Sequence, residues 1–397
     1  MNTIQSLRLI YELYYKKGLP NLDLIQSYGL LAIKIGQIHA LRLDFLPPEK
    51  CEHLAKLYRQ NTVIPLEDTE FNKNFIGKYK SLEKTPFASA SVGQVYKAKL
   101  LDDTDIVIKI VKSKFKKQFS HDVAKIRKFF KLILWLNPKL KGVGNPLGIL
   151  DDIEEYTLTE LDLRNEIKGQ KTLLDIYEEY KDKFDLSMVS FNKIYEEYSD
   201  ENTLVSNFIQ GKTIDELLNE KKFTYDDMLK FFYIQGFYIF IIGRFHGDIH
   251  PGNIIYDQGK FYFIDNAFIG KVGDKIRKGL CVFFDALSHN DYIGCAQGLN
   301  KMSEKELTGE EYKNFENKML DLYKDFTGKT VSEISLTKQM MLTIKLGVIS
   351  GMNFEKGIFS IIRSLMYLDG MVLKCNPNAV LMNDMRKFVE EYRDYIM

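Results

Sequence analysis

The sequence of 397 residues contains little cysteine and no long apolar run. Its four cysteines, which show no C-x-x-C spacing, are Cys51, Cys281, Cys295 and Cys375. This pattern argues against a structural zinc site and indicates a reducing compartment. The sequence also lacks an apolar stretch of about 18 residues, the length typical of a membrane-spanning helix, and the features of a signal peptide. We therefore expect a cytoplasmic protein, with peripheral contact to a membrane left open.

A charge excess of either sign is also missing. Lysine and arginine together number 55, and aspartate and glutamate 54, so the formal net charge is +1. The lack of a basic excess argues against a nucleic-acid partner. Hydrophobic residues make up 45% of the chain and charged residues 27%, as in ordinary globular proteins. The length allows more than one packed domain.

The first third of the chain changes from a helical to a β pattern. Residues 22–43 carry apolar side chains at helical spacing, and Pro47-Pro48 predicts where that helix ends. Residues 86–111 change character. Apolar residues between Val92 and Leu100 precede an acidic, turn-like segment at 102–105, and a strand-like run follows at 106–110, which predicts a β-hairpin.

Helical patterns dominate from residue 112 onwards, with short β interruptions. Residues 204–206 predict a short strand, and Thr213 has the position of an N-cap with Glu216 at the third helical position. Residues 231–242 are apolar enough for a buried core helix, and 260–264 predict another strand.

This order of elements predicts an α+β protein with a bilobal, protein-kinase-like fold. Two further features are an N-terminal helical extension and helices inserted in the small lobe. The predicted domains are the extension at 1–80, the small lobe at 81–208 and a helical C-terminal lobe at 209–397.

The most informative segment is residues 246–253, which are H-G-D-I-H-P-G-N, followed by Asp265 at the end of the predicted strand. Phosphoryl transfer needs an aligned acceptor and neutralised charge, both of which oxygen side chains with Mg²⁺ provide. In this spacing Asp248 is the candidate that orients the acceptor. Asn253 and Asp265 are the candidate metal ligands. A solvated loop is the alternative interpretation.

Lys109 is the candidate phosphate-binding lysine, because it lies in a strand opposite the apolar Ile108 and Ile110. A lysine there needs an anionic partner, and Glu166 is the candidate. The alternative is a solvent-exposed lysine on an edge strand.

Small residues before the hairpin occupy the place of a glycine-rich phosphate loop. They contain one glycine, which limits how closely the backbone approaches a phosphate. The residues assigned to nucleotide binding, besides Lys109, are Ala88, Ser89, Ala90, Ser91, Val92, Gly93, Asn207 and Phe208. A plain turn of small residues is the alternative.

These motifs together resemble the UbiB/AarF family of atypical kinases, which is linked to ubiquinone and other isoprenoid-lipid metabolism. The matching segments include K-x-G-Q at 34–37, the alanine-rich loop at 88–94, E-x-D at 160–162 and the loop at 246–253. The resemblance extends from about residue 28 to about residue 387. It implies ATP and Mg²⁺ as cofactors, an isoprenoid lipid or anionic membrane surface as a partner, and contact with proteins of quinone biosynthesis.

The resemblance also implies a regulatory, occluding role for the helical extension. Lys34 is expected to lie near Glu160 and Asp162, covering the place where ordinary kinases bind a protein substrate. Gly36 lets the helix pack closely, and Gln37 completes the motif. The alternatives are a surface lysine and an acidic, solvated helix face.

The sequence departs from the family pattern at three places. Ser89 stands where alanine is usual, and Asp265-Asn266-Ala267 replaces D-F-G. The second change puts the usual conformational switch in doubt, because alanine tolerates a positive φ poorly. The chain also ends near residue 397, so we expect no C-terminal membrane anchor.

Three functions therefore stay open. The leading one is an ATP-dependent atypical kinase or ATPase. The second is a small-molecule kinase of the aminoglycoside or choline type. The third is a non-catalytic, nucleotide-gated lipid-binding or scaffold protein, in which an N-terminal helix lies at a membrane interface. That helix carries Ile4, Leu7, Ile10, Tyr11 and Tyr14, with Lys16 and Lys17 at its end. The alternative interpretation is a helix that packs on the kinase core and does not contact a membrane.

Overall fold

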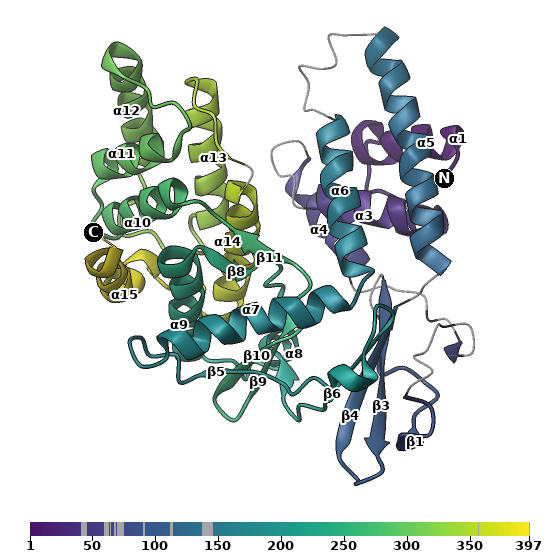
Figure 1. Cartoon of the computed structure of the whole chain (residues 1–397). Helices are drawn as coiled ribbons and strands as arrows, with labels where there is room; N and C mark the ends of the chain where they lie inside the picture. Colours follow the sequence, from purple (N-terminus) through teal and green to yellow (C-terminus); the bar gives the residue numbers. More distant parts are fainter. Residues whose placement is uncertain are drawn as a thin grey trace. The chain divides into compact units, whose positions relative to one another are not determined.

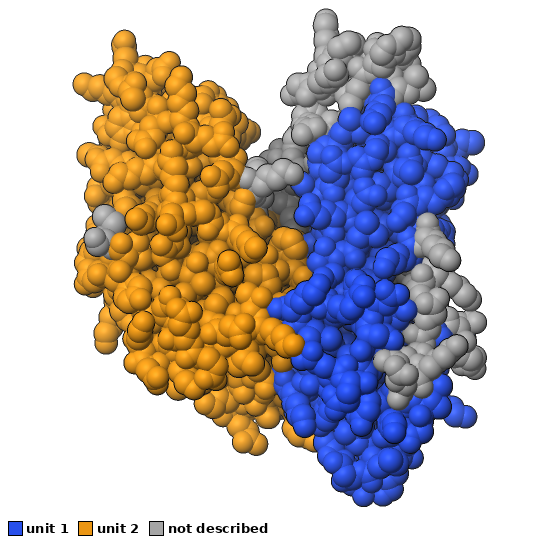
Figure 2. Space-filling model, viewed as in Figure 1, with its two compact units in different colours: residues 1–168, 192–208 blue, residues 169–191, 209–397 orange. Residues whose placement is uncertain are grey.

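The computed structural model describes residues 1–40, 46–58, 63, 65–66, 69, 75–89, 92–111, 114–136, 146–355 and 357–396. The chain forms two units, coloured separately in Figure 2. Unit 1 consists of residues 1–168 and 192–208, and unit 2 of residues 169–191 and 209–397. Unit 1 therefore contains the predicted extension (1–80) and most of the predicted small lobe (81–208). Residues 169–191 of that lobe belong to unit 2.

Unit 1 combines a helical layer with an antiparallel sheet (Figure 1). Its helical elements are α1 (Thr3–Ile10), the π-helix η1 (Tyr11–Tyr15), α2 (Leu22–Ser27), α3 (Leu30–His39), α4 (Pro48–Ala55), η2 (Lys56–Tyr58), α5 (Lys114–Leu136), α6 (Pro146–Glu160) and η6 (Glu196–Tyr198). Helix α7 (Arg164–Tyr180) starts in unit 1 and continues into unit 2.

The single helix predicted over residues 22–43 is wrong. Helix α2 ends at Ser27 and α3 begins at Leu30. Gly29 between them has φ +91°, a left-handed conformation that breaks the helix and that glycine adopts at little cost. The last part of the prediction, residues 41–43, lies outside the described residues.

The sheet of unit 1 has the order β1-β3-β4-β6, and β2 also pairs with β3. Its strands are β1 (Tyr79–Leu82), β2 (Ala88–Ser89), β3 (Gly93–Leu100), β4 (Asp105–Val111) and β6 (Thr203–Asn207). The predicted hairpin is confirmed, because β3 pairs with β4 from Gly93–Val111 to Lys99–Asp105. Since side chains alternate along a strand, Ile106, Ile108 and Ile110 are completely buried on one face of β4. Lys109 therefore lies on the other face.

Unit 2 is mainly helical. Its longer helical elements are α8 (Ile214–Asn219), α9 (Tyr225–Gly236), the π-helix η7 (Phe237–Ile242), α10 (Asp274–Ser288), α11 (Tyr292–Met302), α12 (Gly309–Tyr323), α13 (Leu336–Ile349), α14 (Gly357–Cys375) and α15 (Leu381–Ile396). Its short strands and the 3₁₀ turn η8 are β5 (Val189–Ser190), β7 (Lys212–Thr213), β8 (Arg244–His246), η8 (Pro251–Asn253), β9 (Ile254–Asp257), β10 (Lys260–Phe263) and β11 (Ile269–Lys271).

The apolar segment at 231–242 is buried, as predicted, and forms the end of α9 together with η7. Phe231 and Phe237 are completely buried in the core of unit 2. The predicted N-cap is also confirmed, since Thr213 and Glu216 form a reciprocal capping box on α8.

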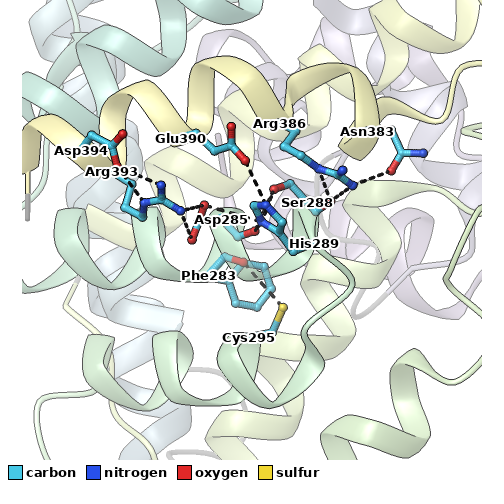
Figure 3. A network of polar contacts seen from close by, with 10 residues as sticks. All are labelled: Phe283, Asp285, Ser288, His289, Cys295, Asn383, Arg386, Glu390, Arg393 and Asp394. Atoms are coloured by element: carbon cyan, nitrogen blue, oxygen red, sulfur yellow. Dashed lines mark hydrogen bonds and ion pairs between the residues drawn. The ribbon is translucent and has the colours of Figure 1, made fainter.

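A polar network joins α10 to α15 (Figure 3). Arg393 of α15 donates two hydrogen bonds to the Asp285 carboxylate, at 3.0 and 3.2 Å. Arg386 donates from both Nε and Nη2 to the backbone carbonyl of Ser288. The C-terminal helix is therefore fastened to α10 by arginine contacts as well as by apolar packing.

Among the described residues, we find no helix that is both long and apolar enough to cross a bilayer.

Candidate active site

The loop predicted to be catalytic lies in unit 2, between two short pairs of strands. Strand β8 ends at His246 and pairs antiparallel with β11. After the loop, η8 leads into β9, which pairs antiparallel with β10. Beyond the last pair of that ladder, the Ile264 amide donates to the Asn253 carbonyl at 3.0 Å. This bond places Asp265 beside Asn253, at one end of the β9–β10 hairpin.

His246 connects the segment that contains Asp248 with the segment that precedes Asp265. Its imidazole is buried and connects the Ile264 carbonyl, 3.0 Å from Nε2, with the Asp248 amide, 3.2 Å from Nδ1. An amide donates and a carbonyl accepts, so Nδ1 is the acceptor and Nε2 carries the proton. Burial lowers the pKa of this imidazole, consistent with the neutral tautomer that these two bonds require. His246 thus fixes the backbone at Asp248 and at Ile264, the residue before Asp265.

The candidate acceptor-orienting and metal-binding side chains contact each other. Asn253 Nδ2 donates to the Asp248 carbonyl at 3.0 Å and lies 3.3 Å from Asp248 Oδ2. With its nitrogen used in this way, the side-chain oxygen of Asn253 is the atom of the amide that can accept a further contact.

The residues available for a metal fit Mg²⁺ with a nucleotide. Among the described residues, no group of three or more histidine, cysteine, aspartate or glutamate side chains is arranged to hold a metal. Mg²⁺ typically takes one or two protein oxygens, several waters and substrate phosphates, rather than a cage made of protein alone. Asn253 and Asp265 offer hard oxygen ligands of this kind.

Asp265 has an unusual backbone conformation, with φ +59°. A left-handed residue other than glycine stores strain of roughly 1–3 kcal/mol, and aspartate is among the residues that tolerate it best. The sequence pattern predicts that a positive φ is required at Ala267. Ala267 is not among the described residues with positive φ, whereas Asp265 is. The replacement of glycine by alanine therefore strains nothing at that position.

Asn266 and Gly169 hold this strained segment in place. The buried side chain of Asn266 donates from Nδ2 to the Phe263 carbonyl at 2.8 Å. A Cβ on Gly169 of α7 would lie 1.8 Å from the Asn266 carbonyl oxygen. Helix and loop backbone are therefore in direct contact. Gly169 was not among the residues predicted from the sequence. A glycine inside a helix costs about 1 kcal/mol relative to alanine, so its presence there indicates a structural requirement.

In unit 1, Lys109 Nζ lies 2.7 Å from Glu166 Oε2. Both side chains are largely buried, with exposed fractions of 14% and 7%. Charges at that depth need partners, so the pair fixes the lysine on the face of the sheet opposite Ile108. Gly93 is adjacent, since a Cβ there would lie 3.9 Å from Lys109 Cε and 3.1 Å from the Ile110 carbonyl oxygen.

The other residues assigned to nucleotide binding are distributed around this sheet. Ala88 and Ser89 form β2, Val92 is buried, and Ala90 and Ser91 lie outside the described residues. Asn207 accepts a hydrogen bond from the Lys193 amide at 2.5 Å. The Phe208 ring packs edge-on against Phe87 and lies 4.5 Å from Lys97 Nζ. Phe208 thus has a structural role in unit 1 that the sequence did not reveal.

The K-x-G-Q segment lies in α3 and contacts α6. Lys34 is buried and forms an ion pair with Glu160, and its Nζ also lies 5.3 Å from the centre of the Tyr156 ring. Gly36 packs against Leu57, whose Cδ1 would be 2.5 Å from an added Cβ.

The second acid of E-x-D has a different partner from the one expected. Asp162 accepts two hydrogen bonds from Arg164, from Nε at 2.9 Å and from Nη2 at 2.6 Å. This fork of hydrogen bonds lowers the pKa of the Asp162 carboxyl. Glu160 therefore provides the contact to Lys34, and Asp162 stabilises the start of α7. Gln37 is buried and donates to the Leu57 carbonyl at 3.0 Å.

Residues 52–299 match the ABC1 atypical kinase-like domain. The chain belongs to this family. The resemblance to UbiB/AarF proteins is confirmed by curated relatives. A probable protein kinase UbiB from Sodalis glossinidius is 24% identical over 385 residues, covering 93% of this chain and 69% of the relative. The corresponding protein of Histophilus somni is 25% identical over 394 residues, covering 93% and 70%.

A third curated relative is an uncharacterised protein from the hydrogenase 1 5′ region of Clostridium pasteurianum. It is 24% identical over 394 residues, covering 94% of this chain and 71% of the relative. Among solved structures, the Mycobacterium tuberculosis Rv3197–erythromycin complex aligns with a TM-score of 0.52 at 17% identity, covering 95% of this chain and 92% of that one. This likeness, together with the family match, shows the kinase-like α+β fold.

The neutral state of His246 predicts a loss of stability in acid. Because the native pKa is below the unfolded value of 6.5, the unfolded chain binds a proton first as the pH falls below 6.5. We expect His246→Gln to unfold with a weaker dependence on pH between about pH 7.5 and 5.5, by about 1.4 kcal/mol for each unit of pKa difference removed. Urea unfolding of both proteins across this range measures the difference. Identical slopes would contradict the neutral assignment.

The contact at Gly169 predicts a large effect of one methyl group. Gly169→Ala should lower the free energy of unfolding by roughly 1–3 kcal/mol, because the Asn266 backbone has to move. Gly370→Ala is the matched control, a glycine within α14 whose added Cβ would meet nothing within 4 Å. It should stabilise the protein by up to about 1 kcal/mol. Urea unfolding compares the two, and equal effects would show that the Gly169 contact is unimportant.

Proposed function

We propose that this protein is an atypical kinase or ATPase that binds Mg-ATP and transfers the γ-phosphoryl group to a hydroxyl or to water. The observation that carries the proposal is the contact of Asn253 with Asp248, together with the hydrogen bond from the amide of Ile264, the residue before Asp265, to the Asn253 carbonyl. Membership of an atypical kinase-like family supports it.

Each residue has a separate role in this proposal. Lys109 contacts the α- and β-phosphates, and Glu166 orients Lys109. Asn253 and Asp265 hold Mg²⁺, which when bound neutralises charge on the phosphates. Asp248 orients the acceptor oxygen and takes its proton as the bond from that oxygen to the γ-phosphorus forms. The bond from phosphorus to the bridging oxygen of ADP breaks in the same transfer.

The likeness to proteins named UbiB supports a place in quinone or other isoprenoid-lipid metabolism. An isoprenoid lipid, an anionic membrane surface and proteins of quinone biosynthesis are the partners that this proposal implies. Lys34, paired with Glu160, is proposed to be part of the occluding extension that favours such substrates over a protein substrate.

Removing the Asp265 carboxylate tests the proposal. Asp265→Asn should lower phosphate release from Mg-ATP by roughly 10²–10³-fold, because the proposed Mg²⁺ site loses its charged protein ligand and the reacting phosphoryl group loses electrostatic stabilisation. Asp274→Asn is the matched control, since Asp274 is also in unit 2 but has a side chain that is 82% exposed. Its turnover should equal that of the unaltered protein. Full activity of the Asp265 variant would refute the proposed role.

The non-catalytic lipid-binding alternative is favoured by one specific observation in unit 1. Ile4 and Leu7 of α1 are 76% and 53% exposed, and the basic Arg8 and Lys17 are exposed nearby. Other residues of the same segment line a mostly apolar cavity of about 100 Å³, and the hydrogen-bonded Tyr14 and His39 also line it. Residues lining it include Leu9, Ile10, Leu13, Ile35, Phe130 and Ile153. This arrangement suits an anionic lipid surface.

Vesicle binding distinguishes that alternative. Since Leu9 and Leu13 are buried core residues, substitution is a cleaner test than truncation. We expect the double variant Ile4→Ser and Leu7→Ser to bind vesicles of phosphatidylcholine and phosphatidylglycerol at least about tenfold more weakly, because apolar contact is lost. The control pair is Val348→Ser and Ile349→Ser, two exposed apolar residues of α13. Equal sedimentation of the unaltered protein and of both double variants with the vesicles would exclude α1 as the membrane contact.

A further inference from the structure

Arg363 of α14 reaches the catalytic loop from 116 residues away in the sequence. Its Nη2 donates a hydrogen bond to the Gly247 carbonyl at 2.5 Å. Its guanidinium carbon lies 5.1 Å from the centre of the Phe268 ring. One side chain therefore touches the residue just before Asp248 and a residue three positions after Asp265.

Gly247 and Phe268 are also in contact with each other. The Gly247 amide donates to the Phe268 carbonyl at 2.9 Å. A Cβ on Gly247 would lie 2.2 Å from Phe268 Cδ1, so the ring rests directly on the glycine backbone. Gly247, Phe268 and Arg363 thus form a closed set of three contacts, which we name the loop clamp.

Helix α14 provides a rigid base for the loop clamp. Its residues Ile361, Ile362 and Leu365 are buried in the core of unit 2. The arginine therefore extends from an element that is fixed by packing, and the loop takes its position from that element. Arginine suits this task because its planar group donates hydrogen bonds and lies over an aromatic ring at the same time, whereas lysine is a point charge.

We propose that Arg363 is a positioning residue for phosphoryl transfer. By holding Gly247 and Phe268 together, it fixes the backbone of Asp248 relative to that of Asp265. In this role it acts on the reaction through these neighbours. The kinetic part of this inference rests on the proposed function, but the structural part does not.

The test compares Arg363→Lys with Arg386→Lys. Arg386 is a matched control because it also donates to a backbone carbonyl, that of Ser288. It differs in that it belongs to the α10–α15 network of Figure 3 and not to the loop clamp. The first measurement is hydrogen exchange of residues 246–253 in the nucleotide-free protein. Arg363→Lys should raise exchange there by roughly tenfold, because the loop opens locally more often, and Arg386→Lys should not.

The second measurement is the steady-state turnover of Mg-ATP. A displaced loop should lower kcat by roughly 10–100-fold while the KM for ATP changes little, since small misplacements cost rate rather than binding. A merely structural arginine would instead leave the kcat and the KM of the folded protein unchanged. If the unaltered protein has no turnover, the proposed function fails, and the exchange measurement still tests the loop clamp.

A second variant covers the case in which Arg363→Lys does not fold. Phe268→Leu keeps an apolar side chain but removes the ring under the guanidinium. It should raise exchange in the same segment, and the double variant should exchange no faster than the more affected single variant, because both act on one unit. Wild-type exchange of residues 246–253 in either folded single variant would overturn the proposal.

Discussion

The arrangement of the candidate site depends on a buried, neutral histidine. His246 lies between a carbonyl one residue before Asp265 and the amide of Asp248. Only one tautomer serves both bonds, and a second proton on the ring would place a donor against the Asp248 amide. The positions of both aspartates thus follow from the protonation state of a side chain that need not touch substrate.

Backbone contacts, more than side-chain chemistry, set the geometry around this histidine. Asp265 adopts a left-handed conformation that costs energy in isolation. The hydrogen bond from Asn266 and the close contact with Gly169 offset that cost locally. The departure from D-F-G is therefore accommodated, because Asn266 adds a bond to the Phe263 carbonyl that phenylalanine cannot make.

The sequence was sufficient for those parts of the site that are local. Asp248 and Asn253 are five positions apart in one loop, and Asp265 follows the next hairpin, whose pairing brings Ile264 into hydrogen-bond contact with Asn253. The burial pattern around Lys109 follows from the alternation of side chains along one strand. Each of these inferences concerns a short segment, for which the geometry of turns and strands leaves few choices.

Contacts between distant segments were not predictable in this way. Arg363 and Gly169 lie far along the chain from the loops they touch, and nothing in their immediate neighbours identifies those partners. The preference of Asp162 for Arg164 over Lys34 is a competition between two cations, decided by the reach of a side chain two residues away. The break at Gly29 was missed because the apolar pattern continues across it.

The glycines of unit 2 have a consequence for how variation in this family should be read. An added Cβ would lie 2.2 Å from the Phe268 ring at Gly247 and 2.8 Å from the Phe283 backbone nitrogen at Gly298. Neither position offers a functional group, yet neither has room for one more carbon atom. Under selection such sites would be as invariant as catalytic residues. Invariance at such a position would reflect the lack of space for a Cβ atom, and a glycine beside an aspartate need not have any part in the chemistry of that aspartate.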